Sequence, residues 1–279
     1  MKAKPWQVVG LYSVLVIAVI FAIYPIWFVA LASVRPGQRL LTLNLVNMFI
    51  PTEVTWQNFR QLLIQEPFSI WFKNSFLVAG LTTIFCLSLS TTGAFAFSRF
   101  RFRGREALLI LLLAINAFPG VLSLIPITQI LRAAGIFGTH WGLILAYSAG
   151  TLVFTTWNLK GYFDAIPMQL EEAALIDGAS PLQAFVYIVL PLARPALAVT
   201  ALFGFLAGWN EYVMAMVMLP GKEQMHTLPV GLVNLAGSHT TPWGLFAAGA
   251  LLISAPTLIV FLSVQRHLES GLTVGGVKG

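Results

Sequence analysis

The densest group of side chains with a defined chemistry lies at 171–178. Glu171, Glu172 and Asp177 are carboxylates that can pair with cations, and Gly178 permits a sharp bend in the backbone. Small alanines between these carboxylates allow a helix to approach another surface closely. These residue types are suited to an element that packs against another surface.

Local signals predict that two short helices carry this group. Good helix formers fill 168–177, and the acids lie near the start, where the helix dipole favours negative charge. Gly178 is suited to end this helix. Ser180 is suited to cap a second helix over 181–189, which ends at Pro191. We therefore expect two short helices that meet at a bend.

The pattern alone leaves two placements of this helix pair open. The pair could dock on a partner protein, or it could lie on the bilayer surface with apolar side chains among the lipid headgroups. The side chains buried in the second case would be Leu175, Ile176, Phe185 and Ile188.

The composition indicates that much of the chain is surrounded by lipid. Of the 279 residues, 58% are hydrophobic and 9% are charged, whereas soluble domains carry roughly 25% charged residues. The 16 Lys and Arg against 10 Asp and Glu predict basic loops at an anionic membrane surface. Nucleic-acid binding is the poorer explanation, because the basic residues lie in short loops between apolar stretches and form no long patch.

Six apolar stretches are long enough to cross a bilayer, which takes about 20 residues. Lipid cannot satisfy the backbone polar groups of open strands, so these stretches are predicted to be helices. The sequence thus predicts an all-α fold with six transmembrane helices in a single transmembrane domain over 1–279. The expected spans are 10–34, 74–98, 107–131, 141–159, 196–219 and 244–264.

The first stretch has some features of a signal peptide, since Lys2 and Lys4 precede it. Its apolar run, however, exceeds the roughly 7–15 residues of a signal core, and Pro25 interrupts it. We therefore expect an uncleaved helix.

Basic residues set the expected orientation. Four arginines lie between Arg99 and Arg105, and such a cluster is difficult to move across a membrane. We therefore expect this turn and the long loop at 160–195 to face the cytoplasm. Six spans then place both termini in the cytoplasm, with a C-terminal tail at 265–279.

A few polar or helix-breaking residues fall inside the expected spans. Glu211 lies beside Asn210 in the fifth stretch, and Asn116 lies in the third, just before a kink at Pro119. A charged carboxylate at the bilayer centre costs at least about 2.5 kcal/mol, so Glu211 should face protein or water. Two roles stay open: the lining or gate of a pore, or a hydrogen-bond network that fixes helix packing.

The loop at 160–195 carries residues at fixed spacings. They are Glu172, Ala173, Ala174, Gly178, Ile188, Leu190 and Pro191, together with Asp177, Ala179 and Phe185. This set resembles the signature loop of the permease subunits of ABC importers and, in its last three members, the sugar-importer branch. In that family the helix pair docks in a cleft on the ATP-hydrolysing subunit. The resemblance implies that this loop, with Glu171, couples ATP hydrolysis to transport.

Similar segments extend along nearly the whole chain. They lie at 94–104, 116–119, 125–126, 135–139, 209–212 and 271–279. Together they resemble the maltose-type sugar permeases, and specifically the shorter of the two paired subunits. In that subfamily the tail reaches between two ATPase subunits, whereas the residues alone would suit a disordered end. The tail residues are Gly275, Gly276, Val277, Lys278 and Gly279.

The resemblance implies a non-catalytic transport subunit of a bacterial or archaeal cytoplasmic membrane. Its implied partners are a second homologous permease, two ATPase subunits, an extracytoplasmic sugar-binding protein and the lipid bilayer, but no nucleic acid. The ATPase subunits would bind ATP and Mg²⁺, because this sequence has no G-x-x-x-x-G-K-[ST] motif, and we expect no metal or other cofactor on this chain. The implied solute is a di- or oligosaccharide, with a glycerol-phosphate-type solute as the alternative.

An ion-gradient-driven secondary transporter is the alternative function. Such a protein would need several ionisable residues in the membrane, often on broken helices in inverted repeats. Only Glu211 qualifies, and no repeat is visible. An intramembrane enzyme is a poorer fit still, because the expected spans contain one carboxylate and no histidine.

Overall fold

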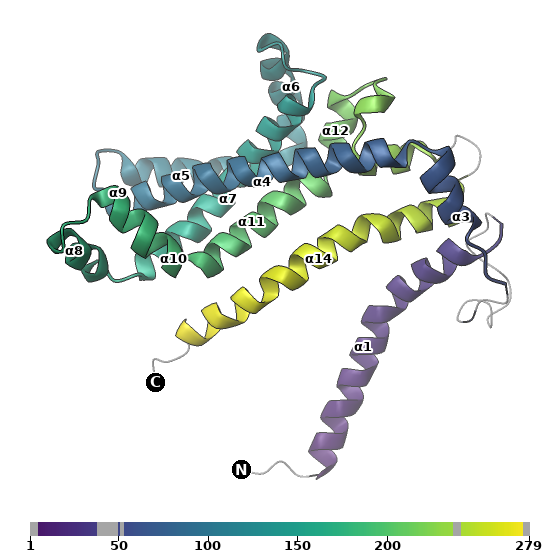
Figure 1. Cartoon of the computed structure of the whole chain (residues 1–279), viewed down its shortest axis with the longest axis horizontal. Helices are drawn as coiled ribbons and strands as arrows, with labels where there is room; N and C mark the ends of the chain where they lie inside the picture. Colours follow the sequence, from purple (N-terminus) through teal and green to yellow (C-terminus); the bar gives the residue numbers. More distant parts are fainter. Residues whose placement is uncertain (1–4, 38–49, 51–52, 237–240, 276–279) are drawn as a thin grey trace. The chain divides into compact units, whose positions relative to one another are not determined.

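Every regular element that the structure describes is a helix, in agreement with the predicted all-α fold (Figure 1). The structure is a computed structural model, and the residues it describes are 5–37, 50, 53–236 and 241–275. The chain divides into two compact units. The first unit comprises Met1–Ser69 and Gly231–Ala255, and the second comprises Ile70–Val230 and Pro256–Gly279.

Long apolar helices alternate with short helical segments along the chain. In order they are α1 (Pro5–Val34), α3 (Gln57–Arg60), η1 (Gln61–Gln65), α4 (Phe68–Arg99), α5 (Arg105–Asn116), η2 (Gly120–Ser123), α6 (Leu124–Ala133), α7 (His140–Ala165), α8 (Gln169–Ile176), α9 (Pro181–Ala184), η3 (Phe185–Val189), α10 (Leu190–Leu192), α11 (Arg194–Trp209), α12 (Val213–Met218), η4 (Glu223–Met225), α13 (Leu228–Asn234) and α14 (Trp243–Gly275). Pro25 lies inside α1 without ending it.

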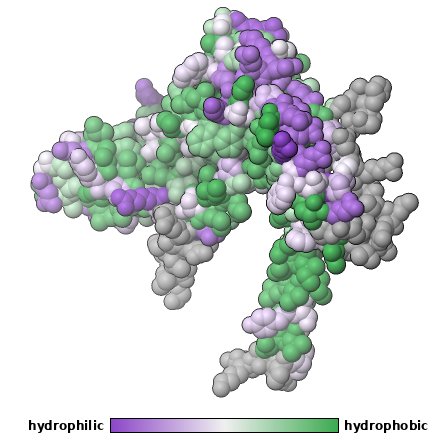
Figure 2. Space-filling view, turned by 45° about the vertical axis from the view of Figure 1, so that its right-hand side comes forward, coloured by the Kyte–Doolittle hydropathy of each residue, from purple (hydrophilic) through white to green (hydrophobic). Residues whose placement is uncertain are grey.

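In the first unit, the end of α1 is fixed by one polar side chain. The Nδ2 of Asn58, on α3, donates to the carbonyl oxygens of Ser33 at 2.9 Å and Arg35 at 3.1 Å. Gly244 approaches the same amide so closely that a Cβ there would lie 2.6 Å from Nδ2. Most of α1 before this point is apolar and exposed (Figure 2). Such a surface suits contact with lipid or with another membrane helix.

The core of the second unit is built from α4, α7 and α11. Much of α7 is buried, and α11 packs along it. Two glycines four residues apart bring α11 close to α4. A Cβ at Gly208 would lie 2.7 Å from the Cα of Ala79, and a Cβ at Gly204 would lie 3.1 Å from the Cα of Thr83. Small residues at this spacing are typical of closely packed membrane helices.

Three to five membrane spans are supported by length and composition among the described residues. The three single helices that qualify are Trp6–Val34, Phe68–Arg99 and Trp243–Gln265. Two bent pairs qualify if each counts as one span. These are Arg105–Asn116 with Gly120–Ala133, bent by 98°, and Pro181–Leu192 with Arg194–Trp209, bent by 80°.

Two expected spans are not continuous helices. The stretch at 107–131 is broken at Pro119, whose ring removes a backbone donor, and the helices on either side meet at 98°. The stretch at 196–219 is broken at 210–212, between α11 and α12. The expected span at 141–159 lies inside the continuous α7, which is not among the helices that qualify by length and composition.

The two ends of α4 carry different sets of loops. At its C-terminal end, Arg99 pairs with Glu171 on α8. Near its N-terminal end, the Nδ2 of Asn74 donates to the carbonyl oxygens of Gln224 and His226. The charge pattern of the sequence predicts that the loops at these two ends of α4 lie on opposite faces of a membrane.

Candidate functional site

The first helix of the pair, α8, ends at a glycine cap. Gly178 has a φ of +91°. The N–H of Ala179 donates to the carbonyl oxygen of Ala174 at 2.9 Å, and the N–H of Gly178 donates to that of Leu175 at 3.1 Å. These two bonds form a Schellman motif, whose left-handed residue is least strained as glycine. The predicted bend is therefore present.

The second helix begins almost immediately with a capping box. The Oγ of Ser180 accepts from the N–H of Gln183 at 3.3 Å, and the Oε1 of Gln183 accepts from the N–H of Ser180 at 2.7 Å. The helix continues from α9 through the π-helical η3. Only Ala179 separates the glycine cap from this N-cap, so the local sequence fixes both sides of the bend.

The inner face of the helix pair is attached to the end of α4. The Nε of Arg99 donates to the Oε1 of Glu171 at 2.6 Å, and these side chains are only 9% and 12% exposed. The rings of Phe185 and Phe95 lie 4.3 Å apart between centroids. Phe95 and Arg99 are four residues apart and therefore lie on one face of α4.

A second ionic contact lies at the same end of α4. The Oδ1 of Asp164 accepts from the Oγ of Ser98 at 2.6 Å, and its Oδ2 accepts from the Nζ of Lys160 at 2.6 Å. Burial raises the pKa of Asp164, but the hydrogen bonds from Lys160 and Ser98 outweigh it. The pKa of Asp164 therefore lies below its ordinary value of 3.8, and the carboxylate is ionised at neutral pH.

The outer face of the helix pair carries the side chains that a partner can reach. The exposed members of the predicted set are Glu172, Ala173, Asp177 and Gly178. Beside them, Ile176 is 86% exposed and Tyr187 is 73% exposed. Exposed apolar side chains rimmed by carboxylates are typical of an interaction surface.

Other members of the predicted set face inward. Glu171, expected to pair with a partner, pairs with Arg99 of its own chain, and Ala174 is buried. Of the four side chains that the bilayer alternative would place among the headgroups, Phe185 and Ile188 are partly buried in the protein, whereas Leu175 and Ile176 are exposed. The remaining partly buried members are Ala179, Leu190 and Pro191.

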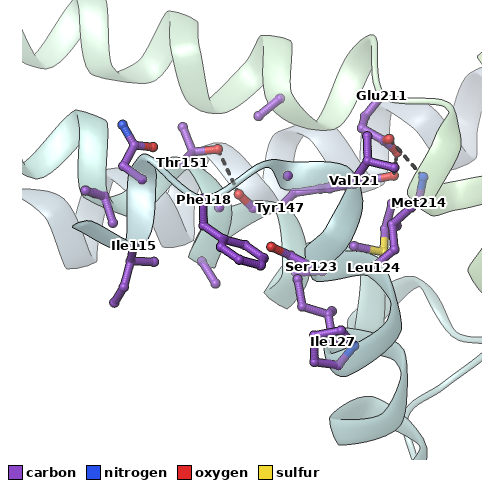
Figure 3. Close-up of a pocket in the computed structure, with 18 of the residues that line it drawn as sticks. Ile115, Phe118, Val121, Ser123, Leu124, Ile127, Tyr147, Thr151, Glu211 and Met214 are labelled. Carbon is purple, nitrogen blue, oxygen red and sulfur yellow. Dashed lines mark hydrogen bonds between the residues drawn. The ribbon is translucent and has the colours of Figure 1, made fainter. Parts of the chain in front are cut away.

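A separate cavity of about 1070 Å³ lies in the second unit (Figure 3). Its lining is mostly apolar and comes from the bend between α5 and α6, from α7, and from the break after α11. Asn116 and Glu211 both contribute to this lining, with Tyr147 and Thr151 from α7. Pro119 lies at the α5–α6 bend, and Asn210 lies at the α11–α12 break.

Glu211 caps the helix that follows the break. Its carboxylate accepts from the N–H of Met214 at 2.9 Å, the N–H of Ala215 at 3.2 Å and the hydroxyl of Tyr147 at 2.7 Å. Backbone N–H groups in the first turn of a helix have no partner within the helix, and a side-chain oxygen there satisfies them. The expected hydrogen-bond network is therefore present, and the same carboxylate also lines the cavity.

Some features of the site were missed from the sequence. In the sequence, Arg99 served only as evidence for the orientation of the chain in the membrane. An arginine at the end of a span can also pair with an acidic helix from a later part of the chain. The glycine pair at Gly204 and Gly208 was readable as a small-xxx-small motif. Within the described residues, no group of three or more His, Cys, Asp or Glu could hold a metal ion. Of the predicted tail, Gly275 ends α14 and 276–279 lie outside the described residues.

The chain is similar to a known family of membrane proteins and to two characterised permeases. Residues 88–274 match the family described as the binding-protein-dependent transport system inner membrane component. A galactooligosaccharide permease protein, GanQ of Bacillus subtilis strain 168, is 38% identical over 96% of this chain and 94% of its own length. The maltose/maltodextrin permease protein MalG of Escherichia coli K12 is 37% identical over 92% of this chain and 90% of its own.

A solved structure shares the fold. A chain of a bacterial ABC transporter that imports the acidic polysaccharide alginate superposes with a TM-score of 0.79 at 23% sequence identity, covering 95% of this chain and 98% of that chain. The family match covers more than half of this chain, and the two permeases exceed 30% identity along nearly all of it. The chain therefore belongs to the binding-protein-dependent transport system inner membrane components, and it is a membrane permease subunit of such a transport system.

Proposed function

We propose that this permease imports a di- or oligosaccharide and that the helix pair α8–α9 couples it to a separate ATPase subunit. The observation that carries the coupling role is the division of the helix pair into two faces. Its inner face is held to α4 by an ion pair and a ring contact, whereas its outer face exposes Glu172, Asp177 and Ile176. A rigid element with one attached face and one open face can transmit the movement of a partner.

The choice of solute is supported by the relatives. The similar permeases are named for galactooligosaccharides and for maltose and maltodextrin, and all are aligned along nearly their whole length. The ion-gradient alternative is disfavoured, because both carboxylate oxygens of Glu211 accept hydrogen bonds from the hydroxyl of Tyr147 and the first turn of α12, which is a structural role. A glycerol-phosphate-type solute remains the competing substrate class for the experiment below.

The proposed assembly contains a second homologous permease, two ATPase subunits that bind ATP and Mg²⁺, and an extracytoplasmic binding protein. The chain would cross the membrane six times with both termini in the cytoplasm, and its tail beyond Gly275 would reach the ATPase subunits. The loop at 220–243, of which 237–240 lie outside the described residues, would face the binding protein. This segment is held by Asn74 and by the Nζ of Lys222, which donates to the carbonyl oxygen of Gly138 at 2.8 Å.

The solute is tested by purifying this chain with its partners and reconstituting the complex in liposomes. Maltooligosaccharides, galactooligosaccharides and glycerol 3-phosphate are offered with the binding protein, and ATP hydrolysis and uptake are measured. We expect one of the oligosaccharides to stimulate both, with no effect of a protonophore. Uptake that stops with the protonophore and continues without ATP would contradict the importer mechanism, and stimulation by glycerol 3-phosphate alone would contradict the sugar.

The orientation is tested by labelling in intact cells with an impermeant thiol reagent. Ser180→Cys should be protected and Gln224→Cys should be labelled, because they lie at opposite ends of the second unit. The single natural cysteine, Cys86, is buried and should give little background. Labelling of Ser180→Cys without labelling of Gln224→Cys would contradict the proposed orientation.

A further inference from the structure

We propose that Arg99 and Glu171 form the joint through which the helix pair moves α4, and that both are positioning residues for coupling. The proposal rests on the proposed coupling function of the helix pair. Neither side chain belongs to the exposed outer face, so their role differs from docking. The joint would decide whether ATP hydrolysis is converted into movement of the membrane helices.

Arg99 donates hydrogen bonds to three residues, two of which lie on distant parts of the chain. Its Nε donates to Glu171 on α8 at 2.6 Å, its Nη2 donates to the carbonyl oxygen of Ile166 at 3.1 Å, and its Nη1 donates to the Oγ of Ser98 at 3.1 Å. Only 9% of the side chain is exposed. A planar guanidinium held by directed bonds in a buried site has little freedom to swing, and lysine could not reproduce this geometry.

A second attachment lies one helical turn away on α4. Phe95 contacts Phe185 at 4.3 Å between ring centroids, and it contacts Phe163 of α7 edge-on at 6.1 Å. Phe163 is fully buried, as is Val189 at the end of η3. An ionic contact and an apolar contact on the same face of α4 resist both sliding and rotation of the helix pair. Movement of the pair therefore moves the end of α4 with it.

The polar network extends from α4 into α7. Ser98 accepts from Arg99 and donates to Asp164, which also accepts from Lys160. The joint thus holds α8, α4 and α7 together at one end of the second unit. Because α7 packs along α11, and α11 ends at the break that carries Glu211, these packed helices connect the joint to the cavity.

Two adjacent glutamates provide a matched pair of variants. Glu171→Ala and Glu172→Ala are the same substitution on the same helix, but the first removes a buried ion-pair partner and the second removes an exposed carboxylate. Removing one partner of a buried pair leaves an uncompensated charge, whereas an exposed pair contributes little. The structure therefore predicts very different effects on coupling.

The experiment uses the complete transporter in liposomes with its binding protein. Three quantities are measured for each variant: the ratio of ATPase subunit to this chain, the rate of ATP hydrolysis, and the number of sugars imported per ATP. We expect Glu171→Ala and Arg99→Met to retain the ATPase subunits and to hydrolyse ATP. Their sugar-to-ATP ratio should fall by about tenfold or more, as expected for a broken buried pair. Glu172→Ala should act on docking instead, lowering the ratio of ATPase subunit to this chain by up to about fivefold, while complexes that stay assembled keep the wild-type sugar-to-ATP ratio.

Two milder variants keep the test decisive if Glu171→Ala does not fold. Glu171→Gln keeps an oxygen that can accept from Arg99, and Ser98→Ala removes the link to Asp164 without leaving a charge buried. Glu171→Gln keeps the hydrogen bond but leaves the Arg99 charge unpaired, so we expect it, like Ser98→Ala, to show a sugar-to-ATP ratio between those of wild type and Glu171→Ala.

A sugar-to-ATP ratio that is unchanged in both Glu171→Ala and Ser98→Ala would refute the proposal. If Glu171→Ala cannot be purified, an unchanged sugar-to-ATP ratio in Ser98→Ala alone would refute it. Loss of the ATPase subunits from Ser98→Ala would also overturn it, because the network would then serve docking. If the wild-type chain itself retained no ATPase subunit, the proposed coupling function would fail first.

Discussion

A methyl group at Gly208 should disturb the packing of α11 against α4 more than a methyl group at other helical glycines. Its Cβ would lie 2.7 Å from the Cα of Ala79, while ordinary contacts begin at 3.4 Å. The two backbones would therefore have to separate by about 0.7 Å, because neither atom belongs to a flexible side chain. Overpacking of this kind costs about 1–3 kcal/mol, which exceeds the ~0.5–1 kcal/mol that alanine gains over glycine in a helix.

Two other glycines provide the scale for this prediction. Gly204→Ala should cost less, since its nearest backbone atom is the Cα of Thr83 at 3.1 Å. Gly80→Ala should be neutral or stabilising, because nothing lies within 4 Å of its Cβ.

The assay is the thermal unfolding midpoint of each purified variant in one detergent. A change of 1 kcal/mol shifts Tm by about 2–4 °C for a domain of this size, so Gly208→Ala should unfold several degrees below Gly80→Ala, with Gly204→Ala between them. Equal Tm values for Gly208→Ala and Gly80→Ala would refute the close approach of α11 to α4.

Two further predictions concern charged groups. Glu211→Gln should lower Tm less than Glu211→Lys, because Gln keeps one oxygen for the amide N–H groups of α12 while Lys places a cation beside these donors. Measurements of Tm and of sugar uptake check this prediction, and an equal decrease of Tm in the two variants would contradict the capping role. The lowered pKa of Asp164 means that its contribution to stability is present above pH ~4 and is lost as the pH falls through its lower folded-state pKa. The Tm difference between wild type and Asp164→Asn should therefore be constant near neutral pH and shrink in acid, and a difference that grows in acid would contradict it.

The bend of the helix pair could be predicted because its causes are local. Gly178 supplies the left-handed residue, and Ser180 caps the next helix two residues later. The inward orientation of Glu171 could not be predicted in the same way. Its partner Arg99 is 72 residues away in the chain, so the pairing depends on the packing of α8 against α4. Periodicity within α8 does not carry that information.

The helix break at 210–212 could not be predicted from hydropathy. The stretch at 196–219 is apolar enough to suggest one continuous span, and hydropathy does not register a change of direction. Glu211 was recognised as unusual because of its charge, but its role as a cap depends on where α12 begins. At 107–131 the kink at Pro119 was predicted, whereas its angle of 98° depends on the packing of α5 and α6.

The coupling role of the helix pair is tested most directly by Gly178→Val with Gly161→Val as its control. Gly178 has a φ of +91°, which strongly disfavours a β-branched residue, whereas Gly161 is an exposed position inside α7. Neither Cβ would meet another atom within 4 Å, so the two variants differ in backbone strain and not in crowding. The measurement is the ratio of ATPase subunit to this chain after purification in detergent. We expect the wild-type ratio for Gly161→Val and a large loss for Gly178→Val; a wild-type ratio and wild-type sugar uptake for Gly178→Val would contradict the account.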